Sequence, residues 1–234
     1  MSLNQAQHKN ILIKILKDIY SNAAIGPILG FKGGTAAYLF YNLDRFSVDL
    51  DFDLLDVNKE EIVFEEISRI LRNYGQIKTA DKKRYSLLYI LAYNEKEPEA
   101  QNVKIEVNRR NFGSQYAIKS YLGIPMKVMT PGDMAANKLV AFYERIGKTN
   151  RDIYDTWFFF SNNWPINREL VERRTNMTFH EFLEKSLELL QEMDNKSILS
   201  GMGELLSDKQ KTWVKNKLKD ELVFQIRLYL ETNG

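Results

Sequence analysis

The stretch Arg45-Phe46-Ser47-Val48-Asp49-Leu50-Asp51-Phe52-Asp53 decides how this chain folds. Its acidic residues recur at every second position, and the apolar residues Val48, Leu50 and Phe52 stand between them. A period of two predicts a strand over 48–54 whose carboxylates all point to one side. The stretch therefore predicts a sheet strand with an apolar face and a strongly acidic face.

The carboxylates of this strand suit a divalent cation. Asp49 and Asp51 are two residues apart, so their side chains start about 6.6 Å apart and point the same way. Such a pair can hold two Mg²⁺ ions about 3.5–4 Å apart, whereas without a cation three neighbouring carboxylates repel one another. The alternative is a solvent-exposed sheet face, but Asp is a poor strand former and seldom recurs there. We therefore predict a site for Mg²⁺, or for Mn²⁺.

A third carboxylate comes from Glu106. It lies in a second alternating segment, Val103 to Asn108, and its neighbours on the opposite face are apolar. A neighbouring strand can bring Glu106 to Asp49 and Asp51, where it binds metal or accepts a proton. The alternative is that Glu106 belongs to an ordinary polar face.

Gly33, Gly34 and Thr35 stand between a predicted buried strand at 27–31 and a predicted helix at 35–42. A turn of this kind exposes backbone N–H groups and a helix N-terminus, both of which suit phosphate. It is neither a Walker A loop nor a dinucleotide fingerprint, because the required lysine and third glycine are missing. The turn is therefore a candidate phosphate site because it precedes the acidic strand.

The remaining pattern predicts an α+β lobe over residues 1–129, with a mixed or antiparallel sheet flanked by helices, and a helical lobe over 130–234. The lobe boundary is placed where Thr130 and Pro131 form a good helix start. Asn94 to Gln101 is expected to be an exposed hairpin loop. The first lobe is expected to hold helices at 5–22 and 58–74 and strand-like runs at 85–93, 103–108 and 116–122.

The composition excludes several kinds of site. The 234 residues contain no cysteine and only two histidines, so cysteine-ligated zinc, thiol nucleophiles and His-rich metal sites are ruled out. Lys+Arg 33 against Asp+Glu 31 leaves a net charge of +2, too small for nucleic-acid binding by bulk charge. The first 20 residues do not form a signal peptide, and the aromatic run at 157–160 is too short to span a bilayer. We expect a cytoplasmic enzyme, without a membrane, that works with carboxylates, lysines, arginines and hydroxyls.

The predicted helical lobe carries a second group of charges. Lys138 and Arg145 are seven residues apart and share a helix face; Asp152 and Asp155 share another, and Arg151 can pair with Asp155. Lys138 is placed to reach a triphosphate, and Asp152 to orient that lysine or a catalytic water. The alternative is a lattice of ion pairs on the surface of two helices.

Three further basic segments are ambiguous. The segment Lys209–Lys219 carries five lysines, and it either holds an RNA backbone or is the solvated face of a helix that buries Trp213 and Leu218. Lys82-Lys83-Arg84 and Arg109-Arg110 allow the same two interpretations.

The order strand, Gly-Gly-Thr, helix and acidic strand is similar to the first motif of polymerase-β-type nucleotidyltransferases. More narrowly, the chain resembles the AbiEii/AbiGii toxin family, which has a Lys-Gly-Gly-Thr run like 32–35 and an Arg-Phe-Ser-x-Asp-Leu-Asp-Phe segment like 45–52. Residues 138–145 resemble the family's Lys-Leu-x-Ala-x-x-x-Arg helix, and 151–155 resemble its Arg/Lys-Asp-x-x-Asp helix start. The resemblance covers about residues 28–160.

The resemblance implies a polymerase-β-like nucleotidyltransferase lobe followed by the helical lobe. It implies Mg²⁺-dependent transfer of a nucleoside monophosphate from an NTP to an acceptor hydroxyl, with release of pyrophosphate. It further implies the toxin of a toxin–antitoxin (abortive infection) system, acting on tRNA or another macromolecule and restrained by an antitoxin protein. The alternatives are a small-molecule (antibiotic-type) nucleotidyltransferase and a non-catalytic nucleotide- or partner-binding domain of the same fold.

The resemblance also implies roles for individual residues. Asp49 and Asp51 would bind metal, and Glu106 would complete the site and deprotonate the acceptor. Lys138 and Asp152 would join them as catalytic residues. The nucleotide would be bound by Gly33, Gly34, Thr35, Ser47, Lys138 and Arg151.

Overall fold

The structure is a computed structural model that describes residues 3–94 and 102–233. The chain divides into two units, Met1–Met129 and Thr130–Gly234, and each is described by itself. Apart from Asn94, the hairpin loop expected at Asn94 to Gln101 lies outside the described residues.

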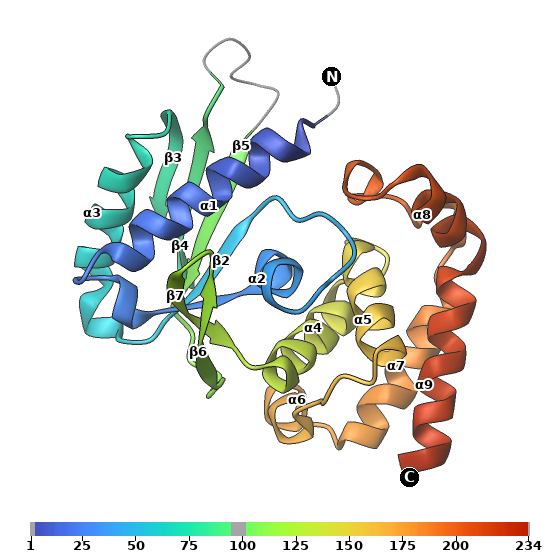
Figure 1. The fold of residues 1–234 in the computed structure, drawn as a ribbon. Helices are drawn as coiled ribbons and strands as arrows, with labels where there is room; N and C mark the ends of the chain where they lie inside the picture. The colour runs from blue at the N-terminus through green and yellow to red at the C-terminus, as the bar shows by residue number, and fades with distance from the viewer. Residues whose placement is uncertain (1–2, 95–101, 234) are drawn as a thin grey trace. The chain divides into compact units, whose positions relative to one another are not determined.

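The first unit is built on one seven-stranded sheet with the strand order β3-β4-β5-β2-β1-β7-β6 (Figure 1). Strand β2 runs antiparallel to β1 and parallel to β5, and β1 runs parallel to β7. The other neighbouring pairs are antiparallel, so the predicted α+β fold with a mixed sheet is confirmed. The strands are β1 Leu29–Lys32, β2 Leu50–Leu54, β3 Gln76–Lys82, β4 Ser86–Ala92, β5 Asn102–Asn108, β6 Tyr116–Tyr121 and β7 Ile124–Met129.

Helices α1 (Gln5–Ser21) and α3 (Glu60–Leu71) cover one face of this sheet (Figure 1). The ring of Tyr20 on α1 packs 6.3 Å from the buried ring of Phe52 on β2. On α3, the ring of Phe64 packs 5.5 Å from that of Tyr89, which is fully buried on β4. The apolar core of the unit therefore lies between the sheet and these two helices. The third helix is α2 (Gly33–Phe40), and short 3₁₀ turns occupy Gly26–Ile28 and Val57–Lys59.

Two strands were not predicted, and each has a physical reason. Strand β3 lies at the sheet edge and is mostly exposed, so it has no buried face to impose an alternating pattern. Strand β7 follows β6 through the two-residue turn Leu122-Gly123, where φ is 50° and 79°. A positive φ is uncommon for leucine, so the sequence Leu122-Gly123 does not predict a hairpin turn.

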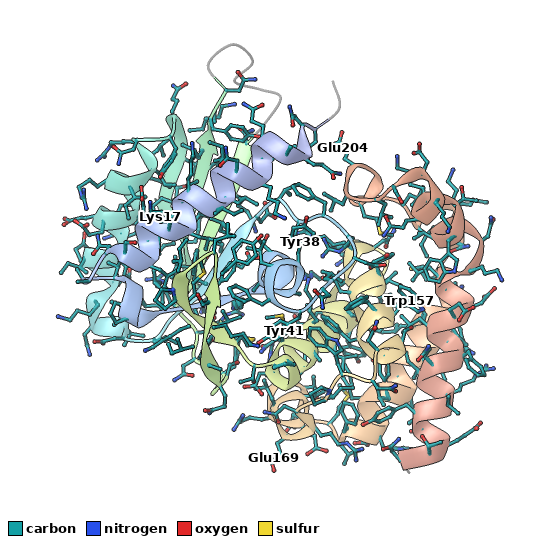
Figure 2. The ribbon with its side chains drawn as sticks, in the orientation of Figure 1. Lys17, Tyr38, Tyr41, Trp157, Glu169 and Glu204 are labelled. Carbon is teal, nitrogen blue, oxygen red and sulfur yellow. The ribbon has the colours of Figure 1, made fainter. Side chains whose placement is uncertain are left out.

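The second unit consists of helices. Aromatic side chains pack against one another within it: Trp157 on α5, labelled in Figure 2, lies 4.3 Å from Trp213 on α8. No helix within residues 3–94 and 102–233 is both long and apolar enough to cross a bilayer. The helices are α4 Pro131–Arg145, α5 Arg151–Ser161, α6 Arg168–Thr175, α7 Phe179–Glu192, α8 Asp208–Trp213, a π-helical turn Val214–Leu218 and α9 Lys219–Asn233, with 3₁₀ turns at Asn195–Ser197 and Gly203–Leu205.

The lysine-rich segment 209–219 packs as an amphipathic surface of this unit. Val214 and Leu218 are buried while Lys215 and Lys217 are exposed. The ammonium of Lys219 donates to two carbonyl oxygens at the end of α7, at 2.8 and 2.6 Å. These contacts favour the solvated-helix interpretation of the segment over the RNA-binding one.

Candidate active site

Two of the predicted carboxylates lie side by side on the sheet. Strands β2 and β5 are parallel, and their register pairs Asp51 with Glu106. The next pair along, Phe52 with Val107, is buried under α1 and α3, so the two carboxylates project from the opposite face. Their side chains are 30% and 37% exposed, which leaves them accessible to a ligand.

Lys104 joins these carboxylates into a cluster. Its ammonium lies 2.9 Å from the carboxylate of Glu106 and 3.9 Å from that of Asp51. We name Asp51, Lys104 and Glu106 the half-exposed cluster. Lys104 was not among the residues predicted for the site, although its position two residues before Glu106 on an alternating strand places it on the same face.

Lys104 and Glu106 shift each other's pKa. Burial favours a raised pKa for Glu106, but the hydrogen bond and charge of Lys104 outweigh burial, and the net pKa of Glu106 is lowered. Burial likewise favours a lowered pKa for Lys104, but the charge of Asp51 and the hydrogen bond to Glu106 outweigh it, so the pKa of Lys104 is raised. Each group stabilises the ionised form of the other.

The glycine turn packs its backbone against the acidic strand. Gly33 has φ +79°, and a Cβ there would overlap the carboxylate of Asp51. A Cβ on Gly34 would lie 2.8 Å from the hydroxyl oxygen of Ser47 and 3.0 Å from the guanidinium of Arg45. Any side chain at either position would therefore displace these neighbouring side chains. The first turn of α2 begins at Gly33, so its backbone amides lie next to Asp51.

The hydroxyls of Thr35 and Ser47 are buried and hold the main chain. They lie 2.9 Å apart, and Thr35 also donates to the carbonyl oxygen of Asp49. These two predicted nucleotide-binding residues therefore fix the backbone that carries Asp49.

A buried histidine holds the same backbone from the other side. His8 on α1 is 1% exposed, and its Nε2 lies 2.9 Å from the carbonyl oxygen of Val48. Because a carbonyl can only accept, Nε2 carries the proton, and in the neutral ring Nδ1 accepts from the Tyr93 hydroxyl at 2.8 Å. The sequence around His8 indicates no role for it, because its partners are distant in the chain.

Asp53, the last carboxylate of the stretch, has a different environment. Its carboxylate accepts from Lys32 at 2.5 Å, from Asn108 at 2.7 Å and from the Tyr116 hydroxyl at 2.5 Å. These bonds tie β2 to β1, to β5 and to β6. The expectation that all three carboxylates of the strand repel one another is therefore wrong for Asp53, because Lys32 neutralises it.

The carboxylates fit a divalent cation in donor type. Asp51 and Glu106 supply hard oxygen ligands from adjacent strands, and Asp49 is two residues before Asp51. The ammonium of Lys104 beside two of them indicates that this position stabilises positive charge. Within residues 3–94 and 102–233, no three acidic or histidine side chains are close enough together to form a ready-made metal cage.

The second unit contains a comparable but buried group of charges. The ammonium of Lys138 on α4 lies 3.0 Å from Asp152 and 2.8 Å from Asp155, both on α5, and Arg145 lies 2.8 Å from Asp152. The side chains of Asp152 and Asp155 are 1% and 0% exposed, and that of Lys138 is 14% exposed. We name these three residues the buried cluster. The surface-lattice interpretation is therefore wrong. Arg151 is half-buried at the start of α5.

Comparison with known proteins agrees with this geometry. The sequence matches the family described as "Nucleotidyl transferase AbiEii toxin, Type IV TA system" over residues 14–217. No match was found among curated protein sequences.

Three solved structures share the fold. A putative nucleotidyltransferase from Helicobacter pylori is 21% identical, with a TM-score of 0.64, covering 100% of this chain and 99% of that one. JHP933 from Helicobacter pylori is 20% identical, with a TM-score of 0.63, covering 99% and 94%. The nucleotidyltransferase toxin MenT4 from Mycobacterium tuberculosis is 16% identical, with a TM-score of 0.54, covering 97% and 89%.

The family match extends from α1 to the π-helical turn before α9, so it includes both units and all the motifs from which the resemblance was drawn. The chain belongs to the AbiEii family of nucleotidyltransferase toxins, and it is a nucleotidyltransferase.

Proposed function

We propose that this chain transfers a nucleoside monophosphate from an NTP to an acceptor hydroxyl, with Mg²⁺ or Mn²⁺ as cofactor and with release of pyrophosphate. The observation that carries the proposal is the pairing of Asp51 with Glu106 next to the backbone of Gly33. Carboxylates beside a helix N-terminus combine ligands for a cation with donors for a phosphate.

In this proposal Asp49, Asp51 and Glu106 hold the divalent cation. When bound, the cation would neutralise phosphate charge and favour loss of the proton from the acceptor hydroxyl. The amides of Gly33 and Gly34 bind phosphate oxygens, while Thr35 and Ser47 keep the strand in place behind them.

The lowered pKa of Glu106 refines its role. A carboxylate whose pKa lies below the ordinary value is a weak base, and general bases work best with a pKa near the working pH. We therefore assign Glu106 to cation binding, where a carboxylate that stays ionised is a suitable ligand.

We also propose that Lys138 and Arg151 bind phosphate. Asp152 and Asp155 hold the ammonium of Lys138 at one position, which suits a lysine that must meet a phosphate at a defined point. Arg151 adds a second cation at the start of α5.

The family description supports a toxin whose partner is an antitoxin protein. We propose tRNA or another macromolecule as the acceptor and the cytoplasm, where NTPs are made, as the location.

The test is an assay with each of the four labelled NTPs, total tRNA and Mg²⁺. The wild-type protein is expected to label RNA with one or more NTPs. Asp51→Asn should reduce the rate at least about a thousandfold, since it removes a ligand that the transition state requires. The matched control is Glu65→Gln, which neutralises an exposed acid on α3 and should leave the rate unchanged. A parallel assay replaces tRNA with a small hydroxylated acceptor. Transfer in that assay alone would favour the antibiotic-type alternative, and no transfer in either assay would contradict the proposal.

A further inference from the structure

Two basic segments meet at one end of β4 and β5. The backbone amide of Arg109 donates to the carbonyl of Tyr85 at 2.9 Å, and that of Lys83 donates to the carbonyl of Ser86 at 2.8 Å. The guanidinium of Arg109 also donates to the carbonyl of Lys83. The segments 82–84 and 109–110, separate in sequence, therefore form one basic surface.

Two arginines supply the net charge of this surface. Lys82 pairs with Glu61, Lys83 with Asp81 and Arg109 with Glu60. Within residues 3–94 and 102–233, Arg84 and Arg110 form no ion pair, and the Nε of Arg110 donates to the neutral amide of Asn108 at 3.1 Å.

These two arginines alternate with aromatic rings. The guanidinium of Arg84 lies 4.9 Å from the ring centre of Tyr85, and that of Arg110 lies 5.2 Å from the same ring and 5.1 Å from the ring of Phe112. We name these four residues the arginine–aromatic platform. Tyr85 is 47% exposed although it is a large ring, and both arginines are exposed. The platform therefore offers flat cationic and aromatic faces to solvent.

A hollow of about 270 Å³ adjoins the platform. Arg110 and Phe112 line it together with Asp53, Tyr116 and the chain between them. It is slightly smaller than the pockets of roughly 300–1,000 Å³ that bind drug-sized ligands, so it suits a single ring system.

Arg110 of the platform lies on the same side of the sheet as the half-exposed cluster. Glu106 and Asn108 both project from that face of β5, and Arg110 follows two residues later, bonded to Asn108. At about 6.6 Å per two residues, the platform begins about 13 Å from Glu106. One flexible strand can therefore reach both.

We propose that the arginine–aromatic platform binds unpaired nucleotides of a nucleic-acid acceptor whose terminal hydroxyl reaches the half-exposed cluster. The proposal rests on the proposed function for the reaction, but the binding step does not. Bases stack on aromatic rings and guanidinium planes only when they are not stacked within a duplex. The carboxylates of an acidic protein would pair with the arginines, but they would not stack on the exposed ring of Tyr85.

The test measures binding without NTP or divalent cation. Fluorescence anisotropy follows a labelled, unstructured 12-nucleotide RNA, with the same sequence as a duplex and with poly-glutamate as competitors. The wild-type protein should bind the single strand at least tenfold more tightly than either competitor. Arg84→Ala with Arg110→Ala should weaken binding at least tenfold and flatten the dependence of log K on log salt by about 1.4, from two lost phosphate contacts.

Matched variants separate stacking from charge. Tyr85→Ala should weaken binding about tenfold, whereas Tyr85→Phe keeps the ring and should bind like the wild type. Arg84→Lys with Arg110→Lys keeps the charge but loses the planar groups, and should retain only part of the affinity. The charge control is Lys14→Ala with Lys17→Ala, two exposed lysines on α1 over the opposite face of the sheet, where Figure 2 labels Lys17. That control should bind like the wild type.

Several results would contradict the proposed role of the platform. They are no binding by the wild-type protein, equal binding of the duplex or poly-glutamate, or equal losses in the control and platform variants. Transfer is assayed separately: RNA binding that depends on the platform, without transfer by the wild type, contradicts the proposed function alone. If platform variants transfer nucleotide to RNA with the wild-type KM for the acceptor, only the proposed role of the platform is contradicted.

Discussion

Each unit holds one lysine between two carboxylates, and the two clusters differ chiefly in burial. In the half-exposed cluster, the side chains are 30 to 37% exposed, and the lysine contacts one carboxylate closely and the other at 3.9 Å. In the buried cluster, the carboxylates are at most 1% exposed, and the lysine contacts both within 3.0 Å. The same three charges thus occur in two very different dielectric environments.

This difference separates a replaceable cation from a permanent one. Partly exposed ion pairs are screened by water and contribute little to stability, so the ammonium of Lys104 can give way to another cation. Buried carboxylates that lose their cation remain uncompensated in a low dielectric. The comparison therefore predicts that the half-exposed cluster governs binding of the divalent cation, and that the buried cluster is required for folding in addition to holding Lys138 in place.

Lys138→Met should have the largest effect on stability. It removes the ammonium that lies 2.8 Å from the buried carboxylate of Asp155, and breaking a buried pair costs about 3–5 kcal/mol in the free energy of unfolding. Urea denaturation measures the loss, with Lys148→Met, an exposed lysine of the same unit, as the control. Lys138→Met combined with Asp155→Asn should recover part of it. A loss below about 1 kcal/mol would remove the distinction between the clusters.

Asp53→Asn should give the next largest effect and tests the contrast within one strand. It removes the charge from an acceptor that holds Lys32, Asn108 and Tyr116, and charge-assisted hydrogen bonds contribute about 1.5–3 kcal/mol. The folded variant should transfer nucleotide within about tenfold of the wild-type rate. Asp51→Asn, one position along the same face, should show the reverse: retained stability and lost transfer. Parallel losses in both variants would show that the strand acts as one unit.

Lys104→Met should have a smaller effect, on the cofactor rather than on the fold. Without the competing ammonium, the Mg²⁺ concentration for half-maximal transfer should fall about threefold to tenfold, while stability changes by less than about 1 kcal/mol. Lys59→Met, an exposed lysine of the same unit, is the control. If more Mg²⁺ is needed, Lys104 assists the reaction instead of competing with the cation.

The sequence predicts the half-exposed cluster better than the buried one. Alternation along two strands predicts that Asp51 and Glu106 each lie on a polar sheet face. The pairing of β2 with β5, which brings the two residues together, cannot be predicted from local alternation. Lys138 and Asp152 were open to a surface interpretation because fully buried charges are rare. Their burial depends on how α4 and α5 pack, which spacing within each helix does not reveal.

The same limit explains the other residues that were missed. His8 contacts Val48 and Tyr93, which are 40 and 85 residues away in the chain. Its roles follow from tertiary packing alone, so nothing in its local sequence marks it. The platform likewise depends on a contact between segments that are 25 residues apart, and each segment by itself reads as an ordinary charged surface.

The smallest expected effect is the contribution of His8 to the pH dependence of stability, and its sign can be derived. Burial lowers the pKa of His8 below its ordinary 6.5, and the hydrogen bond to Val48 and the charge of Asp49 oppose this without cancelling it. Between the lowered pKa and 6.5, the unfolded chain therefore binds more protons than the folded one, so stability rises with pH there. The stability contribution is complete above pH 6.5 and is lost as the pH falls through the folded pKa. A second proton on the ring would also oblige the Tyr93 hydroxyl to stop donating to Nδ1.

Urea denaturation at half-unit steps from pH 5.5 to 7.5 measures this slope, which cannot exceed about 1.4 kcal/mol per pH unit for one histidine. The chain has two histidines, so each provides the control for the other. His8→Gln should flatten the dependence below pH 6.5, whereas His180→Gln removes a ring that is 54% exposed and should leave the slope intact. If the slope instead disappears with His180, then His8 titrates alike in the folded and unfolded chains. In that case its burial beside Val48 does not hold the ring neutral, and the backbone before Asp49 is not fixed by a neutral imidazole.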